Sequence, residues 1–296
     1  MDFDFTDDQQ SLRDAVRRWV DKGFAFERRH GIAKAGGKTR EVYGELAELG
    51  LTGLAVPQAE GGMGFGPVDA MVVMEELGRG LVNAPYAQGA LMAPALLSLA
   101  PDELRAAWLP KIVDASALVV LAHQERAARY RLDHVTTRAV ESATGWTLTG
   151  AKTVVAAGDE ADAFIVPART AGADDAAEGI ALFLVEKGTA GLTVRASPTQ
   201  DGARAAELAL RSAPATLITA QGHAALEHAV DIGIAAACAE GVGLMEKLLA
   251  ITVEYMNTRK QFGVPIASFQ ALRHRIADVK MQLELARSMS YYATLR

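Results

Sequence analysis

Residues 255–270 read YMNTRKQFGVPIASFQ, and this stretch joins two long segments whose apolar residues recur at helical spacing. Arg259 places a positive charge beside the last carbonyls of the first segment, where the helix dipole favours it. Gly263 suits a left-handed C-terminal cap, and Pro265 prevents the helix from continuing. The stretch therefore predicts the end of one long helix and the start of another.

The composition predicts a large folded protein. The chain has 296 residues, 50% of them hydrophobic, so we expect two or three domains. A net charge of −6 argues against a nucleic-acid partner, which needs a basic face. The sequence has neither a signal peptide nor the ~18 apolar residues of a membrane span. Cys238, the single cysteine, is interpreted as a small core residue in a reducing compartment, so we expect a soluble, cytoplasmic protein.

Residues 1–117 carry helix signals and predict an N-terminal helical domain. Thr6 and Gln9 form a capping-box pattern ahead of apolar residues at helical spacing. Pro67 suits the first turn of a further helix. Between these helices, residues 56–64 read VPQAEGGMG and lack the pattern of a phosphate-binding loop, so we expect a tight loop between helices.

Residues 118–222 predict a β domain, because short β-branched or alternating runs are separated by Gly, Asp and Thr. The expected strands are residues 117–122, 135–140, 146–149, 163–166 and 180–185.

Helical spacing returns in residues 223–296, with one long helix expected over residues 224–258 and another from residue 268 onward. The predicted fold is an α+β multidomain fold: an N-terminal helical bundle, a middle β-barrel or sandwich, and a C-terminal helical bundle that these two helices leave incomplete.

The stretch at residues 255–270 resembles the signature R-x-Q-F-G-x-x-I-x-x-F-Q of the acyl-CoA dehydrogenases. The matching residues are Arg259, Gln261, Phe262, Ile266, Phe269 and Gln270. The glycine-rich residues 50–64 and the following EELGR of residues 75–79 also resemble this family's N-terminal domain. The resemblance implies an FAD flavoprotein, in which Arg259 and Gln270 reach the pyrophosphate and adenosine half of a neighbouring subunit's FAD.

Two stretches of the β domain correspond to motifs that touch the flavin in this family. Residues 124–131, QERAARYR, stand where the family has T-E-P-x-x-G-S-D, and residues 150–157, GAKTVVAA, stand where it has G-x-K-x-W-I-T-N. The implied cofactor-binding residues of this domain are Leu121, His123, Gln124, Tyr130, Val154 and Ala156. Both stretches depart from the family pattern, since Ala156 has no hydroxyl to donate to the flavin. The alternative is that Gln124, Tyr130 and Lys152 are ordinary surface or packing residues.

The resemblance implies α,β-dehydrogenation of an acyl-CoA thioester, in which a glutamate removes the α-proton and the β-hydrogen leaves as hydride. One branch of the family places that glutamate at the position of Gly233, which has no side chain, and the other places it beyond Arg296. Glu227, Glu240, Glu246 and Glu254 are interpreted as solvated charges. No catalytic residue and no metal site are therefore assigned, and the chain alone is expected to be nearly inactive.

Within the family, residues 128–135, 198–202 and 258–263 look most like chains called small subunits of pimeloyl-CoA dehydrogenase. The expected partners are an acyl-CoA substrate, an electron-transfer flavoprotein or similar acceptor, and further subunits in a dimer or tetramer. Two alternatives stay open: a catalytically silent partner subunit that lends Arg259 and Gln270 to a neighbour's FAD, and a flavin monooxygenase of the same fold.

Overall fold

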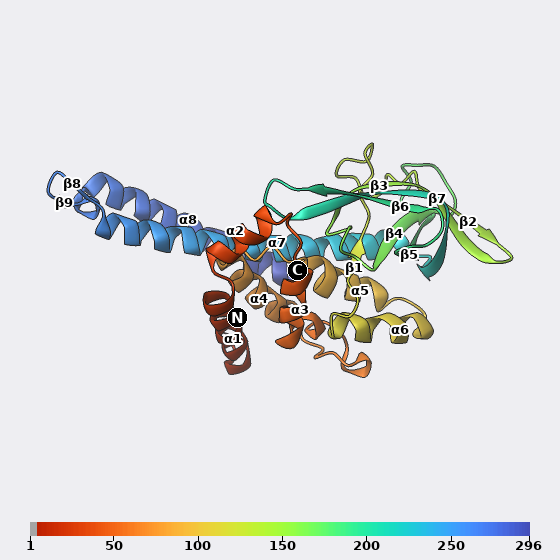
Figure 1. The fold of residues 1–296 in the computed structure, drawn as a ribbon, viewed down its shortest axis with the longest axis horizontal. Helices are drawn as coiled ribbons and strands as arrows, with labels where there is room; N and C mark the ends of the chain where they lie inside the picture. Colours follow the sequence, from red (N-terminus) through yellow and green to blue (C-terminus); the bar gives the residue numbers. More distant parts are fainter. Residues whose placement is uncertain (1–4) are drawn as a thin grey trace. The chain divides into compact units, whose positions relative to one another are not determined.

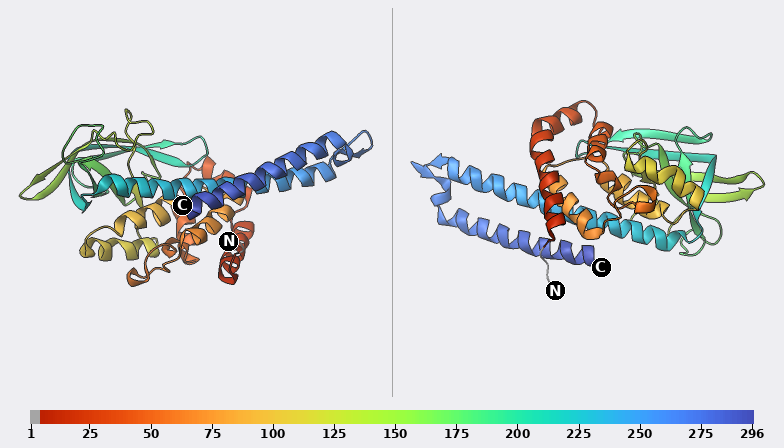
Figure 2. Two further views of the ribbon diagram at one scale, coloured as in Figure 1. Left: turned by 180° about the vertical axis from the view of Figure 1, so that it is seen from behind. Right: turned by 90° about the horizontal axis from the view of Figure 1, so that it is seen from below.

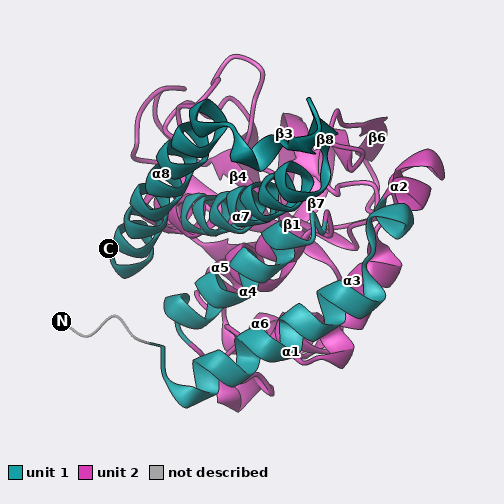
Figure 3. Ribbon diagram, turned by 90° about the vertical axis from the view of Figure 1, so that its left-hand side faces the viewer, with its two compact units in different colours: residues 1–29, 66–82, 234–296 teal, residues 30–65, 83–233 magenta. Residues whose placement is uncertain are grey.

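The computed structural model describes residues 5–296, which divide into two compact units (Figure 3). Unit 1 takes its described residues from segments 1–29, 66–82 and 234–296. Unit 2 consists of residues 30–65 and 83–233. Among residues 5–296, no helix combines the length and apolar character needed to cross a bilayer.

Unit 1 is built on long helices whose starts follow from local sequence. Helix α1 (Asp7–Gly23) begins with the predicted capping box: the Thr6 hydroxyl accepts from the Gln9 amide at 3.2 Å, and the Gln9 side chain accepts from the Thr6 amide at 3.1 Å. Helix α4 (Pro67–Arg79) begins at the predicted proline. Both helix starts are confirmed.

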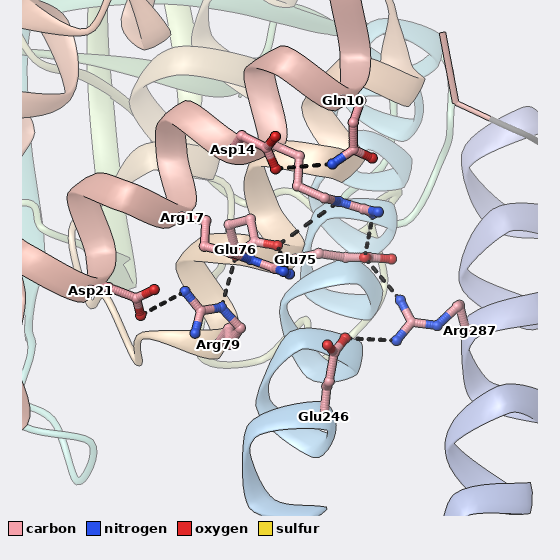
Figure 4. A network of polar contacts seen from close by, with 10 residues as sticks. Gln10, Asp14, Arg17, Asp21, Glu75, Glu76, Arg79, Glu246 and Arg287 are labelled. Carbon is pink, nitrogen blue, oxygen red and sulfur yellow. Dashed lines mark hydrogen bonds and ion pairs between the residues drawn. The ribbon is translucent and has the colours of Figure 1, made fainter. Parts of the chain in front are cut away.

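A buried ion-pair network joins α1 to α4 (Figure 4). Glu76 on α4 is only 2% exposed. Its carboxylate accepts from Arg17 of α1 at 2.6 and 3.0 Å and from Arg79 at 2.8 Å. Arg79 in turn binds Asp21 at 2.9 Å. A buried carboxylate is stable only when its charge is compensated, so these contacts hold α1 against α4.

The adjacent Glu75 extends the network to the C-terminal helices of unit 1. Its carboxylate accepts from Arg13 at 3.1 Å and from Arg287 at 3.0 Å. Arg287, on α8 (Gln270–Leu295), also binds Glu246 of α7 (Gly222–Thr258) at 2.8 Å. Burial is the largest influence on Glu75 and raises its pKa. Glu246 is therefore part of this network, whereas the sequence interpretation made it a solvated charge.

A short hairpin connects α7 to α8, which runs back beside it (Figures 1 and 2). Its strands are β8 (Lys260–Gln261) and β9 (Val264–Pro265), followed by the 3₁₀ turn η4 (Ile266–Ser268). Phe262 and Gly263 have φ of +54° and +82°, as a two-residue type I′ turn requires. Gly263 is left-handed as expected, but the prediction that it caps the helix is wrong, because α7 ends at Thr258.

Cys238 lies on α7 with its side chain exposed, so its interpretation as a core residue is wrong. The apolar neighbours along the chain misled the sequence argument, because a helix distributes consecutive residues over all of its faces.

The N-terminal third of the chain contains several short helices besides α1 and α4. They are α2 (Phe26–Lys34), α3 (Arg40–Glu48), η1 (Leu51–Gly53), η2 (Gln58–Glu60), the π-helical turn η3 (Ala87–Met92), α5 (Ala93–Leu97) and α6 (Asp102–Val113). The predicted loop at residues 56–64 contains η2, and its backbone at Gly62 packs closely against its backbone at Val56. A Cβ added to Gly62 would lie 2.1 Å from the Val56 carbonyl oxygen, so only glycine fits there.

Unit 2 contains a seven-stranded sheet that closes like a barrel (Figure 1). Its strands are β1 (Val119–Leu121), β2 (Arg138–Ser142), β3 (Gly145–Ala156), β4 (Ala163–Arg169), β5 (Ile180–Glu186), β6 (Leu192–Pro198) and β7 (Arg204–Thr219). The order is β1-β4-β2-β3-β7-β5, and β5 also pairs with β4, which closes the ring. Strand β6 pairs with β7 outside that ring.

Strands β4 and β5 are buried on both faces, which explains their continuous apolar sequences. Along β4, Ile165 packs with the helices of unit 2, whereas its neighbours Phe164 and Val166 point into the barrel. Along β5, Leu184 packs with the helices, and Phe183 packs into the barrel. The sheet therefore separates two hydrophobic cores within unit 2.

The predicted fold class is confirmed, with helices at both ends of the chain and a β-rich middle. The five predicted strands overlap β1 to β5, although β2 begins three residues later than expected and β3 is much longer. Strands β6 and β7 were not predicted, because β7 is rich in alanine, which has low β propensity. The bounds of the three predicted domains stay predictions.

The Glu76→Gln variant tests the buried network of unit 1. It leaves Arg17 and Arg79 without their shared anion, so we expect the free energy of unfolding to fall by about 3 kcal/mol. Urea unfolding followed by circular dichroism measures this change. Glu254→Gln, at an exposed position on α7, is the control and should shift stability by less than about 0.5 kcal/mol. Equal stability of the two variants would contradict the role given to Glu76.

Candidate functional site

The candidate site lies where the chain leaves β1 and passes the second half of β3. The register of β3 against β7 pairs Lys152 with Leu208 and then Val155 with Ala206, so β3 carries one extra residue, a β-bulge. Within the bulge, Val154 has φ of +50°, which is rare for a β-branched residue. Its side chain is 64% exposed. The bulge thus presents an apolar side chain on a strained backbone.

A buried ion pair fixes this bulge to the segment after β1. Lys152 Nζ lies 2.7 Å from Glu125 Oε1, and the two side chains are 0% and 4% exposed. The same carboxylate accepts from the backbone amides of Thr136 at 2.7 Å and Thr137 at 3.1 Å, and from both threonine hydroxyls. Glu125 therefore ties both ends of the loop at residues 125–137 to β3.

The charge state of this pair follows from its surroundings. Burial by itself would raise the pKa of Glu125, but the charge of Lys152 and the hydrogen bonds lower it to about 2. Burial also lowers the pKa of Lys152 to about 8, although Glu125 opposes this. Both groups are therefore ionised at neutral pH.

Arg169 holds the far end of the same loop. Its side chain is 1% exposed and sits at the end of β4. The guanidinium donates to the carbonyls of Asp133 and Val135 at 3.0 Å, and also to those of Asp174, Ala176 and Glu178 at 2.9–3.0 Å. One cation thus donates to five backbone carbonyls from two separate loops.

His123 contributes a neutral polar group beside this pair. Its Nδ1 is buried and has no hydrogen-bond partner within residues 5–296. Burial, and secondarily the charge of Lys152, lowers the pKa of His123 to about 4. The imidazole is therefore uncharged at neutral pH, and its buried Nδ1 has an unused hydrogen-bonding capacity among the described residues.

The structure brings three of the six predicted residues of the β domain into one hollow of about 730 Å³, namely Gln124, Tyr130 and Val154. The Thr153 amide donates to the Gln124 carbonyl at 2.8 Å, and this hydrogen bond joins β3 to the segment that follows β1. Of the other predicted residues, Ala156 is half-buried on β3 just after the bulge. Leu121 is only 6% exposed and belongs to the core beneath β1.

The other six predicted residues all lie at the α7–α8 connection in unit 1. They are Arg259, Gln261, Phe262, Ile266, Phe269 and Gln270. Phe262 is 91% exposed and packs edge-to-face against Phe269, with ring centroids 6.1 Å apart. The Arg259 side chain is exposed and has no ionic or hydrogen-bond partner in the described part of the chain. The hairpin thus displays a free cation and an exposed aromatic ring.

Gly233, the position counted for a catalytic glutamate, faces the π-helical turn η3. A Cβ at Gly233 would lie 3.0 Å from Met92 Sδ and 3.2 Å from Met92 Cε. The flexible end of the methionine therefore fills the space next to this glycine.

The Glu125–Lys152 pair was missed by sequence reasoning, which weighed Lys152 as a flavin contact or as an ordinary surface or packing residue, and not as the partner of a buried carboxylate. A signal was present, because Glu125 and Lys152 match the glutamate of T-E-P and the lysine of G-x-K in the two motifs. No sequence signal identified Arg169, whose role depends on carbonyls from two separate loops.

Three family models match this chain and together cover most of it. "Acyl-CoA dehydrogenase, N-terminal domain" matches residues 6–116, the middle domain matches residues 121–212, and the C-terminal domain matches residues 220–296. Acyl-CoA dehydrogenase FadE27 of Mycobacterium tuberculosis is 31% identical over 283 residues, covering 94% of this chain and 72% of that protein.

Solved structures agree with these sequence matches. The glutaryl-coenzyme A dehydrogenase complex with glutaryl-CoA superposes with a TM-score of 0.92 at 26% identity, covering 99% of this chain and 78% of that one. The structure of PigA with FAD and proline superposes with a TM-score of 0.90 at 25% identity, covering 100% and 80%.

Lys152→Met tests the buried pair at the site. It leaves the Glu125 carboxylate buried without its cation, so we expect the free energy of unfolding to fall by about 3–5 kcal/mol. Adding Glu125→Leu should recover part of that loss, because the unpaired charge is then removed. Lys187→Met, at an exposed lysine of unit 2, is the control for urea unfolding. A Lys152→Met protein as stable as this control would contradict the assignment.

Proposed function

The chain belongs to the acyl-CoA dehydrogenase family, whose members are flavoproteins that use FAD, and from this premise we propose that it holds FAD and dehydrogenates an acyl-CoA thioester. The family assignment makes the protein an oxidoreductase. The observation that carries the proposal for this chain is the β3 bulge, which exposes Val154 beside Gln124 in one hollow, while neutral His123 lies within the electrostatic reach of Lys152 at the start of the bulge. When bound, FAD supplies the acceptor for the hydride that leaves the substrate.

The residues around the bulge fit a flavin ring. A flavin offers a flat apolar face and a polar edge with donors and acceptors. Val154 supplies an exposed apolar surface, and His123 Nδ1 is a buried polar atom that lacks a partner among residues 5–296. A neutral imidazole can donate or accept there without the desolvation cost of a charge. Ala156 supplies no side-chain hydrogen bond, so His123 and Gln124 are assigned the polar contacts.

The α7–α8 hairpin fits the phosphate part of the cofactor. The side chain of Arg259 has no anionic partner among the described residues, and a guanidinium binds phosphate by paired charge-assisted hydrogen bonds. We assign Arg259 and Gln270 to the FAD of a neighbouring subunit, together with the aromatic pair Phe262 and Phe269. A dimer or tetramer follows from this assignment. Exposed apolar residues on both helices, such as Leu248 and Met289, supply surface for such contacts.

The substrate part of the proposal rests on resemblance. Residues 128–135 and 198–202 look most like the small subunits of pimeloyl-CoA dehydrogenase, which favours a dicarboxylic or otherwise unusual acyl group. An electron-transfer flavoprotein or similar acceptor, and a cytoplasmic location, stay predictions.

A second candidate function is a silent subunit that lends its hairpin to a neighbour's FAD without catalysing the reaction. The observation that favours it is Gly233, which offers no base and whose neighbouring space Met92 fills. Removal of the weakly acidic α-proton needs a positioned carboxylate. An active dehydrogenase must therefore have such a base, whereas a silent subunit needs none.

Flavin binding tests the proposed cofactor. Purified protein incubated with FAD and desalted should show flavin absorbance, and light scattering of the same sample should give a mass above the 31.4 kDa of one chain. Arg259→Ala should weaken FAD retention by about tenfold or more, because a charge-assisted hydrogen bond contributes about 1.5–3 kcal/mol. Arg275→Ala, an exposed arginine of α8, is the matched control. A colourless wild-type protein would refute FAD binding.

Substitution of Gly233 separates the two functions. Gly233→Glu should raise the rate of acyl-CoA-dependent reduction of an electron acceptor by about 10²–10⁴-fold, the usual contribution of a general base. Gly233→Gln is the control, because it places the same bulk against Met92 without a base. If the wild-type protein reduces the acceptor at ordinary enzyme rates, it is not a silent subunit, and a carboxylate at another position must act as the base. Equal rates in both variants would show that this position does not supply one.

A further inference from the structure

Residues 157–162 follow the β3 bulge and connect β3 to β4, and we call them the β3–β4 turn. The turn begins at Ala157, whose φ of +52° lies in the left-handed region although the residue carries a Cβ atom. Val154, at the bulge itself, has a φ of +50°. Two such residues this close together persist only where surrounding contacts hold them. The end of the bulge therefore needs a fixed point as well as its start.

Glu160 fixes the β3–β4 turn to helix α3. The side chain of Thr39, the N-cap residue of α3, makes no capping hydrogen bond. The Glu160 carboxylate takes that role, since it accepts from the Thr39 amide at 2.9 and 3.1 Å and from the Arg40 amide at 2.9 Å. Free amides and the helix dipole both favour a carboxylate at a helix N-terminus. A helix of 9 residues is marginal by itself, so α3 and the turn stabilise each other.

Asp162 adds a second contact from the same turn. Its carboxylate accepts from the Leu118 amide at 2.7 Å and binds the Arg40 guanidinium at 2.9 Å. Leu118 directly precedes β1, and β1 leads to His123 and Gln124. The β3–β4 turn is therefore joined both to α3 and to the strand that precedes these two proposed flavin contacts.

Apolar packing holds α3 against the same part of β3. Tyr43 of α3 is 0% exposed and belongs to one hydrophobic core with Val155 and Ala157. Val155 is 1% exposed, whereas its neighbour Val154 is 64% exposed. Consecutive residues of the bulge thus have one side chain in the core and one directed outward. Because Val155 is fixed in the core that Tyr43 helps to form, a displacement of α3 would also displace Val154.

We propose that Glu160 is a positioning residue for the flavin: it holds the end of β3 against α3 and so determines where the bulge presents Val154. This inference rests on the proposed function, because Val154 is assigned there to the flavin ring. Glu160 acts through the strand, since its carboxylate is already occupied by the amides of α3. The Glu125–Lys152 pair fixes the start of the bulge, and Glu160 fixes its end.

Hydrogen–deuterium exchange of the whole chain without cofactor tests the structural step. Glu160→Ala removes the acceptor from both α3 amides, so exchange in peptides covering residues 153–158 should become about tenfold faster, as expected for the loss of a charge-assisted hydrogen bond. Peptides covering β5 should be unchanged, which excludes global unfolding. Glu160→Gln keeps one carbonyl acceptor, so it should show a smaller effect and gives the same comparison if Glu160→Ala does not fold. Glu141→Ala, at an exposed glutamate of β2, is the matched control.

Titration with FAD tests the positioning role. Flavin fluorescence should show about tenfold weaker binding by Glu160→Ala. The absorbance band of the bound flavin should also shift, because its contact with the bulge has changed. Glu160→Gln should recover most of both properties, and Glu141→Ala should match the wild type.

Unchanged exchange at residues 153–158 in Glu160→Ala would overturn the inference. Faster exchange with unchanged FAD affinity and an unchanged flavin spectrum would also overturn it, because Glu160 would then serve stability alone. A wild-type protein that binds no FAD would instead refute the proposed function. Faster exchange in Glu160→Ala would still show in that case that Glu160 holds the bulge.

Discussion

The ion pair between Glu125 and Lys152 is the constraint on which the candidate site depends. It joins a loop to a strand through two residues that are 27 positions apart in sequence, and both side chains are almost fully buried within unit 2, at 4% and 0% exposed. A buried pair is seldom a large net source of stability, but once formed it penalises every arrangement that separates the charges. The bulge at Val154 can therefore keep its strained backbone, because the surrounding contacts leave it no relaxed alternative.

Local signals in the sequence were sufficient where short-range physics decides the structure. The Thr6 capping box, Pro67 at a helix start and the long helices around Arg259 all depend on residues a few positions apart. Prediction failed where distant partners decide. Strand β7 is alanine-rich and forms because β3, β5 and β6 satisfy its backbone. For Gly263 the left-handed conformation was predicted correctly, but its role was not. It forms the turn between the paired strands β8 and β9 instead of capping a helix.

The sequence predicted some residues of the candidate site but not their burial or their partners. Motif matching selected Gln124, Tyr130 and Val154, which border one hollow, and the hairpin residues that follow α7. It could not show that Lys152 is buried or that Arg126 and Arg129 lack partners, because burial and pairing are properties of the folded chain. The departures from the family motifs also take on a consistent meaning. The two hydroxyl residues of the first motif are replaced by Gln124 and Tyr130, and its proline and glycine by Arg126 and Arg129, all of which border the hollow that also contains Val154.

Hydrogen–deuterium exchange with and without FAD tests the central claim most directly, because it locates the cofactor on the chain. Exchange slows where a ligand covers or orders the backbone. The account predicts slower exchange in peptides covering residues 121–137 and 150–157 of unit 2 and residues 259–270 of unit 1 when FAD is added. Unchanged exchange in these three segments under conditions where FAD is bound would contradict it.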